Sequence, residues 1–138
     1  MSKKVLAIGG SAFTGRVFSI QMSKKRDIEL HVVNRGQFPL HLENVKEYKS
    51  DRHTPIMVRH LLPNIEFDAM VDFCAYAPGD ASSLLEMLKG RIKHYIIFST
   101  ASVYEPFDHK LKIEEDPVVT KTEGDRVTDY IYNKIGRA

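Results

Sequence analysis

The chain has 138 residues and a mass of 15.8 kDa, which suits one globular domain over residues 1–138 and leaves no room for a second. Its 43% hydrophobic and 28% charged residues exclude disorder as the main state, and no apolar run is long enough for a membrane span or a signal peptide. The balance of 20 Lys+Arg against 18 Asp+Glu, a net charge of +2, does not by itself indicate binding to nucleic acid or to an anionic membrane.

Short apolar runs and helical stretches alternate along the chain. Strands are expected at residues 5–8, 30–33, 45–48, 69–73 and 94–99. Helices are expected at about 14–25, 54–62, 78–89 and from about 125 to 138. Thr54 and Pro55 suit the start of the second helix, and Gly90 suits the end of the third. The residues of the first helix that are expected to face inward are Val17, Phe18, Ile20 and Met22.

Alternation of nearly continuous apolar strands with helices predicts an α/β fold. The expected architecture is a doubly wound parallel sheet of about five strands, covered by helices on both faces. A different order of the strands, such as the flavodoxin-like one, is the alternative.

A glycine turn with the spacing G-x-x-A-x-x-G lies between the first expected strand and the first expected helix. Gly9 can adopt the tight turn, and Gly15 lets the helix lie close to the strand. Ala12 replaces the middle glycine of the more familiar pattern. Backbone N–H groups at the helix start would face a pyrophosphate. The pattern favours dinucleotide binding over a plain connecting turn, and the expected contacts are Gly9, Ser11, Ala12, Phe13, Thr14 and Gly15.

The second expected strand ends at Asn34 and Arg35. NAD-selective sites usually carry Asp or Glu at this place, where the carboxylate binds the ribose hydroxyls. Asn34 can hydrogen-bond there without repelling a 2′-phosphate, and Arg35 could pair with that phosphate. The two residues favour NADP, with NAD possible, while a plain surface arginine is the alternative interpretation of Arg35.

Two further carboxylates lie near strand ends. Asp51 and Arg52 end the third expected strand, and both are expected to contact the cofactor. The Asp51 carboxylate could accept a hydrogen bond from adenine or simply begin the next helix. Asp72 lies within an apolar strand and is expected to have a hydrogen-bond partner.

The chain has one cysteine, Cys74, which excludes an internal disulfide and fits a reducing cytoplasm. We expect Cys74 to be a buried strand-end residue near the cofactor rather than a nucleophile. No His-x-x-x-His spacing occurs among the six histidines, so no metal site is expected.

Several segments occur in a specific order: the glycine turn, Asp72-Phe73-Cys74-Ala75-Tyr76, Phe98-Ser99-Thr100-Ala101-Ser102-Val103-Tyr104 and Tyr130-Ile131-Tyr132-Asn133-Lys134. Together they resemble the extended and atypical short-chain dehydrogenase/reductase family, the NAD-dependent epimerase/dehydratase group. The resemblance implies a Rossmann fold and further cofactor contacts from Cys74, Ala75, Tyr76 and Lys134.

The resemblance also implies a catalytic set of Thr100, Tyr130 and Lys134. Tyr130 and Lys134 share one face of a helix, so the ammonium can lower the pKa of the phenol. The phenolate could then remove a proton from a substrate alcohol while hydride leaves for the nicotinamide. Thr100 would hydrogen-bond the reacting oxygen. Ala101 and Ser102 stand where sugar-nucleotide dehydratases carry Asp-Glu, which leaves epimerases and reductases of nucleotide-sugar-like substrates.

The resemblance implies a protein about twice this length. We therefore expect the chain to stop inside the active-site helix, without the last strands and the substrate lobe, and to have impaired activity. The exposed edge at 94–99 predicts self-association into a homo-oligomer, which light scattering would test. The alternatives to an enzyme are a non-catalytic dinucleotide-binding module and, less favoured, an RNA-binding relative.

Overall fold

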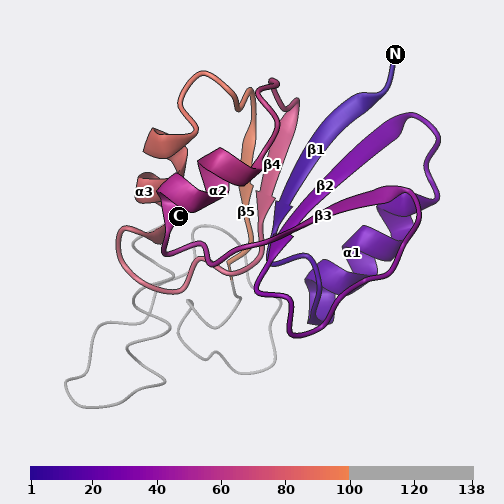
Figure 1. Ribbon diagram of the computed structural model, residues 1–138, viewed down its shortest axis with the longest axis horizontal. Helices are drawn as coiled ribbons and strands as arrows, with labels where there is room; N and C mark the ends of the chain where they lie inside the picture. Colours follow the sequence, from indigo (N-terminus) through magenta and orange to yellow (C-terminus); the bar gives the residue numbers. More distant parts are fainter. Residues whose placement is uncertain (100–138) are drawn as a thin grey trace, which may run out of the picture.

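The computed structural model describes residues 1–99, which form a parallel sheet with helices on both faces (Figure 1). The strands are β1 (Lys3–Ile8), β2 (Ile28–Asn34), β3 (Val45–Lys49), β4 (Ala69–Asp72) and β5 (Tyr95–Ile97). The helices are α1 (Phe13–Ser23), α2 (Pro55–Leu61) and α3 (Asp80–Met87). The catalytic residues expected at 100, 130 and 134 and the last expected helix lie outside the described residues.

The sheet has the order β3-β2-β1-β4-β5, and all neighbouring strands are parallel. This order confirms the doubly wound sheet and excludes the flavodoxin-like alternative. Ile8 at the end of β1 pairs with Val33 on one side and with Asp72 on the other. The carboxyl ends of the central strands are therefore level, and the loops that follow them lie close together.

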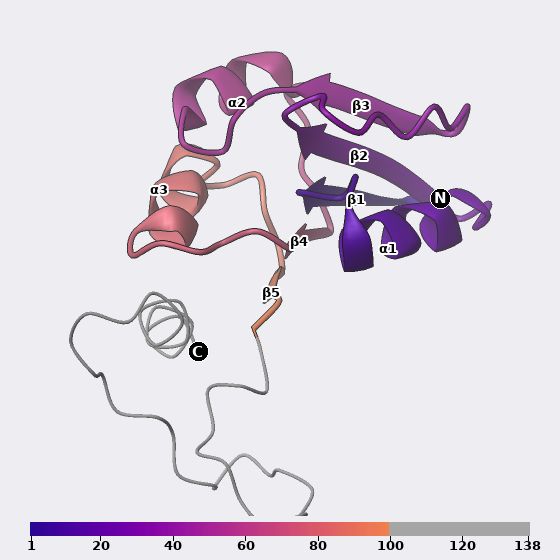
Figure 2. The same cartoon turned by 90° about the horizontal axis from the view of Figure 1, so that it is seen from below.

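Two hydrophobic clusters lie on the two faces of the sheet, because successive side chains of a strand point to opposite faces. In β1, Leu6 and Ile8 belong to the cluster that also contains Val58 of α2 and Leu84 of α3. Ala7 belongs to the other cluster, against which side chains of α1 pack. Figure 2 shows α2 and α3 on one side of the sheet and α1 on the other.

Helix α1 has small residues at the positions where it comes closest to the sheet, while Phe18 and Met22 pack against the hydrophobic cluster. Gly15 and Ser19 are its buried residues, and the Ser19 hydroxyl donates a 2.7 Å hydrogen bond to the Gly10 carbonyl. The expectation for Val17 was wrong, since its side chain is 60% exposed. Val17 lies two residues from both buried positions, about 200° around the helix, and so points away from the sheet. The other three residues expected to face inward, Phe18, Ile20 and Met22, are partly buried.

Within residues 1–99, β5 pairs with β4 alone and lies at one edge of the sheet. Self-association through this edge stays a prediction. In the same part of the chain, no helix is long and apolar enough to cross a membrane.

A buried histidine on β2 makes the stability of the fold sensitive to acid. His31 is fully buried, with Nδ1 2.9 Å from the Tyr48 hydroxyl and Nε2 2.9 Å from Glu29 Oε1. Burial lowers the pKa of His31 below its ordinary value, although the hydrogen bond with Glu29 acts in the opposite direction. As the pH falls, His31 therefore becomes protonated at a higher pH in the unfolded chain than in the folded chain.

We expect the free energy of unfolding to fall as the pH drops below about 6.5, the ordinary histidine pKa. The stability that neutral His31 contributes is fully present above that value and is lost as the unfolded chain takes up the proton. Urea unfolding at a series of pH values should show this slope in the wild type and a flatter slope in His31→Leu. His60→Leu, at an exposed position on α2, is the control. Equal slopes for wild type and His31→Leu would contradict the prediction.

Candidate functional site

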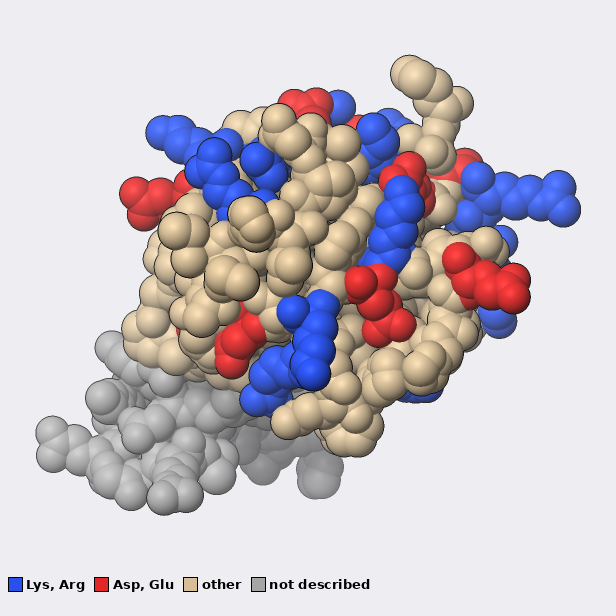
Figure 3. Space-filling model, in the orientation of Figure 1, with Lys and Arg blue, Asp and Glu red and all other residues tan. Residues whose placement is uncertain are grey.

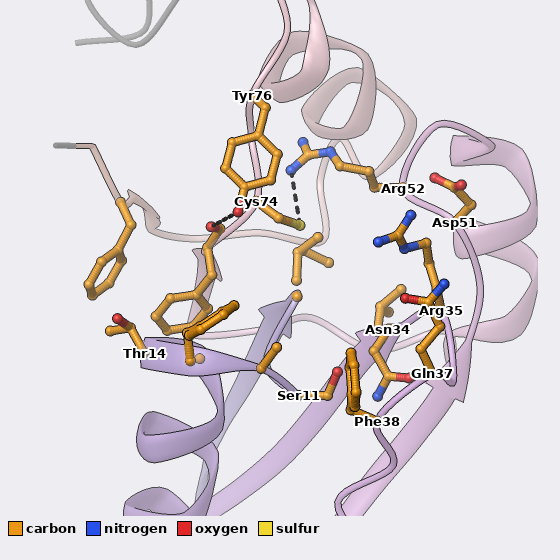
Figure 4. A pocket seen from close by; sticks show the side chains of 18 of the residues that line it. Ser11, Thr14, Asn34, Arg35, Gln37, Phe38, Asp51, Arg52, Cys74 and Tyr76 are labelled. Carbon is orange, nitrogen blue, oxygen red and sulfur yellow. Dashed lines mark hydrogen bonds between the residues drawn. The ribbon is translucent and has the colours of Figure 1, made fainter. Parts of the chain in front are cut away.

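A cavity of about 480 Å³ lies along the carboxyl edge of the sheet and receives residues from the segments that follow all five strands (Figure 4). The residues that line it include Gly9 after β1, Arg35 after β2, Asp51 after β3, Cys74 after β4 and Ser99 after β5. Ligand pockets in proteins typically measure about 300–1,000 Å³. In open α/β sheets they lie at this edge, where the strand order reverses. Here that reversal falls between β1 and β4.

The glycine turn forms one end of the cavity. Gly9 has φ +78°, a conformation that side chains other than glycine rarely adopt. A Cβ on Gly15 would lie 2.5 Å from the Gly9 carbonyl oxygen, so only glycine allows α1 to begin this close to β1. The turn therefore places the first N–H groups of α1 against the cavity.

The amino end of α1 has the features of an anion-binding helix start. Ala12 is the N-cap residue, and no side chain in the described part of the chain caps the helix. No acidic residue lies in the first turn. Uncapped N–H groups and the helix dipole together attract negative charge. The neighbouring Phe13 has φ +46° and a side chain that is 93% exposed, and Phe13 also lines the cavity.

Asn34 and Arg35 at the end of β2 differ in their surroundings. Arg35 is exposed and lines the cavity (Figure 4). The Asn34 side chain is buried, and it donates to Glu47 at 2.9 Å and accepts from the Gly36 N–H at 2.7 Å. Its amide therefore holds the loop after β2 in place. A contact between Asn34 and a ribose stays a prediction.

Asp51 after β3 takes part in the turn that leads into α2. Its carboxylate accepts hydrogen bonds from the His53 N–H at 2.8 Å and from His53 Nδ1 at 2.9 Å. The backbone hydrogen bond from His53 is the main cause that lowers the pKa of Asp51, and the charge of Arg35 acts in the same direction. Asp51 therefore stabilises the turn that leads into α2. It also lines the cavity, and its contact with adenine stays a prediction.

Arg52 is buried and also lines the cavity, and its expected contact with a cofactor stays a prediction. Its guanidinium donates to Asp72 Oδ1 at 2.5 Å and to the Asp80 carbonyl at 2.6 Å. Burial acts to lower the pKa of Arg52, but the hydrogen bond and charge of Asp72 raise it above its ordinary value. Asp72 has the hydrogen-bond partners that the sequence required, since it also accepts from the Tyr95 hydroxyl at 2.9 Å.

Cys74 packs against the glycine turn. Its sulfur lies 2.7 Å from the place that a Cβ on Gly9 would occupy. Burial raises the pKa of the Cys74 thiol, which keeps the thiol protonated. Cys74, two residues beyond the end of β4, lines the cavity and is half-buried, whereas it was expected to be buried. Its contact with the cofactor stays a prediction. In contrast, Ala75 is fully buried and is not among the residues that line the cavity, whereas Tyr76 is.

Neither protein-family models nor curated proteins give a match to this chain. Several solved structures are similar to it. A UDP-Glc/GlcNAc 4-epimerase from Campylobacter jejuni is similar with a TM-score of 0.77 and 19% identity, over 97% of this chain and 46% of its own. A UDP-glucose 4-epimerase from Bifidobacterium longum, in complex with NAD+ and UDP, has a TM-score of 0.76 and 21% identity, over 98% and 47%.

A short-chain dehydrogenase/reductase from Veillonella parvula DSM 2008, in complex with NADP, has a TM-score of 0.62 and 14% identity, over 75% of this chain and 50% of its own. The chain has the fold of the short-chain dehydrogenases/reductases and sugar-nucleotide epimerases. It spans about half the length of the structures it matches.

Within this dehydrogenase/reductase fold, sequence reasoning missed several residues of the cavity, among them two neighbours of Arg35. Gln37 and Phe38 lie in the loop after β2 and line the cavity beside Arg35 (Figure 4). The Phe38 side chain is 61% exposed, which gives the cavity a free aromatic surface. An irregular loop has no sequence period, so the one available signal was an aromatic residue close behind the expected strand end.

The charge distribution of this dehydrogenase/reductase fold agrees with the small net charge. On the face drawn in Figure 3, Lys and Arg side chains lie among Asp and Glu side chains. Among residues 1–99, that face therefore has no extended basic surface of the kind that binds nucleic acid.

Proposed function

We propose that the chain binds NADPH or NADH in the cavity and belongs to the NAD-dependent epimerase/dehydratase group, as the dinucleotide-binding part of an epimerase or reductase. The observation that carries the proposal is the glycine turn at one end of a cavity that follows the carboxyl edge of the whole sheet. The fold shared with enzymes solved in complex with NAD+ or NADP supports it.

The residues fit a dinucleotide. The pyrophosphate would lie against the first N–H groups of α1, where Gly9 and Gly15 leave no side chain in its way. The adenosine end would lie beside Arg35, Phe38 and Asp51, on the β2 and β3 side of the cavity. The nicotinamide end would extend toward Cys74 and Tyr76 on the other side. When bound, the nicotinamide ring supplies hydride transfer.

Arg35 favours NADPH over NADH in this site. Its guanidinium is exposed at the cavity and can pair with a 2′-phosphate, and Asn34 carries no negative charge to repel it. We expect Arg35→Ala to weaken NADPH binding by about 10- to 100-fold, which corresponds to one charged hydrogen-bonded contact, and to leave NADH binding nearly unchanged.

Titration of NADPH and NADH by nicotinamide fluorescence measures this selectivity. Arg26→Ala, an exposed arginine beyond the other end of α1, is the matched control. Equal loss of both dinucleotides in Arg35→Ala would contradict the assignment. If the wild type bound neither dinucleotide, the proposed function itself would be wrong, and RNA binding would become the alternative to test.

The proposed chemistry depends on Thr100, Tyr130 and Lys134. Tyr130 removes the proton from a substrate alcohol, Lys134 lowers the pKa of the phenol and binds the nicotinamide ribose, and Thr100 hydrogen-bonds the reacting oxygen. The proposed substrate is a nucleotide sugar, because similar solved structures are UDP-sugar epimerases.

We expect Tyr130→Phe to lower turnover of a UDP-sugar by about 100-fold or more while NADPH affinity is unchanged, because only proton transfer is lost. UDP-glucose conversion, followed by product chromatography, is the measurement, with Tyr132→Phe as the neighbouring control. Unchanged turnover in Tyr130→Phe would refute the catalytic role. Dinucleotide binding without turnover in the wild type would instead favour a non-catalytic binding module.

A further inference from the structure

We infer that Arg52 and Asp72 are positioning residues, whose buried ion pair holds the loop 73–79 as a wall of the cavity and so sets the affinity for the dinucleotide. The inference rests on the proposed function for its ligand. The geometry of the loop is independent of that function.

The ion pair joins three elements at the carboxyl edge. Arg52 follows β3, Asp72 ends β4, and the Asp80 carbonyl that also binds the guanidinium lies at the start of α3. The side chains of Arg52 and Asp72 are 5% and 0% exposed, so water does not replace these contacts. A single guanidinium therefore fixes both ends of the loop between β4 and α3.

Carboxylates also hold the loop from within. Asp72 Oδ1 accepts a hydrogen bond from the Cys74 N–H at 3.1 Å. Asp80 Oδ2 accepts from the N–H groups of Tyr76 and Ala77, both at 2.8 Å. Only the first residue of the loop has a strand partner among the described residues, since the Phe73 N–H donates to the Ile8 carbonyl of β1 at 3.0 Å. Beyond Phe73, the two carboxylates accept the backbone N–H groups that shape the loop. Arg52 binds the carboxylate of Asp72 and the backbone carbonyl of Asp80.

Three residues of the loop line the cavity: Phe73, Cys74 and Tyr76. Cys74 also packs against Gly9 of the glycine turn. A displaced loop would therefore change both the wall of the cavity and the turn that is proposed to hold the pyrophosphate.

The ion pair is costly to bury. The Arg52 Nε–H is buried without a hydrogen-bond partner among the described residues, which costs about 1–3 kcal/mol. Apolar side chains of similar volume often replace buried ion pairs without loss of stability. A gain in stability therefore does not explain why a buried ion pair occupies this position. Orientation of the loop 73–79 explains it.

The test replaces the pair by apolar residues in the double variant Arg52→Met/Asp72→Leu. We expect it to fold, and its affinity for NADPH to fall by about tenfold or more because a supporting wall is misplaced. The amide hydrogens of Tyr76 and Ala77 should exchange faster, on the order of tenfold, although their acceptor Asp80 is unchanged. Arg59→Met, whose guanidinium contacts the Met87 carbonyl away from the cavity, is the control.

Arg52→Lys is the second variant, which decides the question if the double variant does not fold. A lysine can pair with Asp72 but lacks the planar fork that also reaches the Asp80 carbonyl, so the same two amides should lose protection. Wild-type exchange and wild-type NADPH affinity in the folded variants would overturn the inference. If the wild type binds no dinucleotide, the proposed function fails, and amide exchange still decides whether the pair positions the loop.

Discussion

Replacement of Gly15 by valine is expected to abolish measurable dinucleotide binding and to destabilise the chain by about 3 kcal/mol. A Cβ at this residue would lie 2.5 Å from the Gly9 carbonyl oxygen and 3.0 Å from Gly10 Cα. Both neighbours are backbone atoms, which cannot turn away as a side chain can. The start of α1 must therefore move away from β1, and the N–H groups proposed to bind the pyrophosphate move with it.

Urea unfolding and NADPH titration measure the two effects of Gly15→Val. The matched control is Gly90→Asn, because Gly90 has φ +79° and open space around its Cβ position, and asparagine tolerates this conformation. The control should lose no more than about 1 kcal/mol and keep its affinity for NADPH. A Gly15→Val variant that binds NADPH like the wild type would show that the dinucleotide site lies elsewhere.

The second large effect is expected from Arg52→Met alone, which should destabilise the chain by about 3–5 kcal/mol. The variant leaves the Asp72 carboxylate, 0% exposed, without its cation. The remaining donors to Asp72, the Cys74 N–H and the Tyr95 hydroxyl, carry no charge and do not compensate it. A buried carboxylate without a cation costs far more than the loss of one ordinary hydrogen bond.

Urea unfolding of Arg52→Met beside the double variant Arg52→Met/Asp72→Leu separates the two contributions. The double variant should recover most of the lost free energy of unfolding, because no uncompensated charge remains. Equal destabilisation of both variants would indicate that Arg52 acts through packing of its side chain instead of its charge.

Local residue patterns were enough to predict most of the fold. Apolar runs such as 5–8 and 30–33 are the cores of strands β1 and β2, and Pro55 does begin α2. The errors came from packing. Val17 was expected inside on hydrophobicity, but α1 turns Gly15 and Ser19 toward the sheet, and Val17, two residues from each, points away.

Part of the candidate site was likewise predictable from local sequence, and part was not. The glycine turn was predictable because its chemistry lies in one short segment, with Gly9 and Gly15 at the required spacing. The pairing of Arg52 with Asp72 was not predictable, since the two residues are 20 positions apart. Arg52 follows β3 and Asp72 ends β4, and these two strands are not neighbours in the sheet. The position of Phe38 at the cavity was not predictable either, because it lies in an irregular loop without a periodic sequence pattern.

The sequence by itself determined the alternation of strands and helices, the turn that only glycine can make, and the need of Asp72 for a partner. These follow from the local conformational preferences of residues and from the cost of burying a charge. Only the tertiary structure decided that Arg52 is this partner and that Asp72 and the Asp80 carbonyl hold its guanidinium at the wall of the cavity. That choice depends on how β3, β4 and α3 meet at one edge of the sheet, a contact between segments distant in the chain that no local pattern encodes.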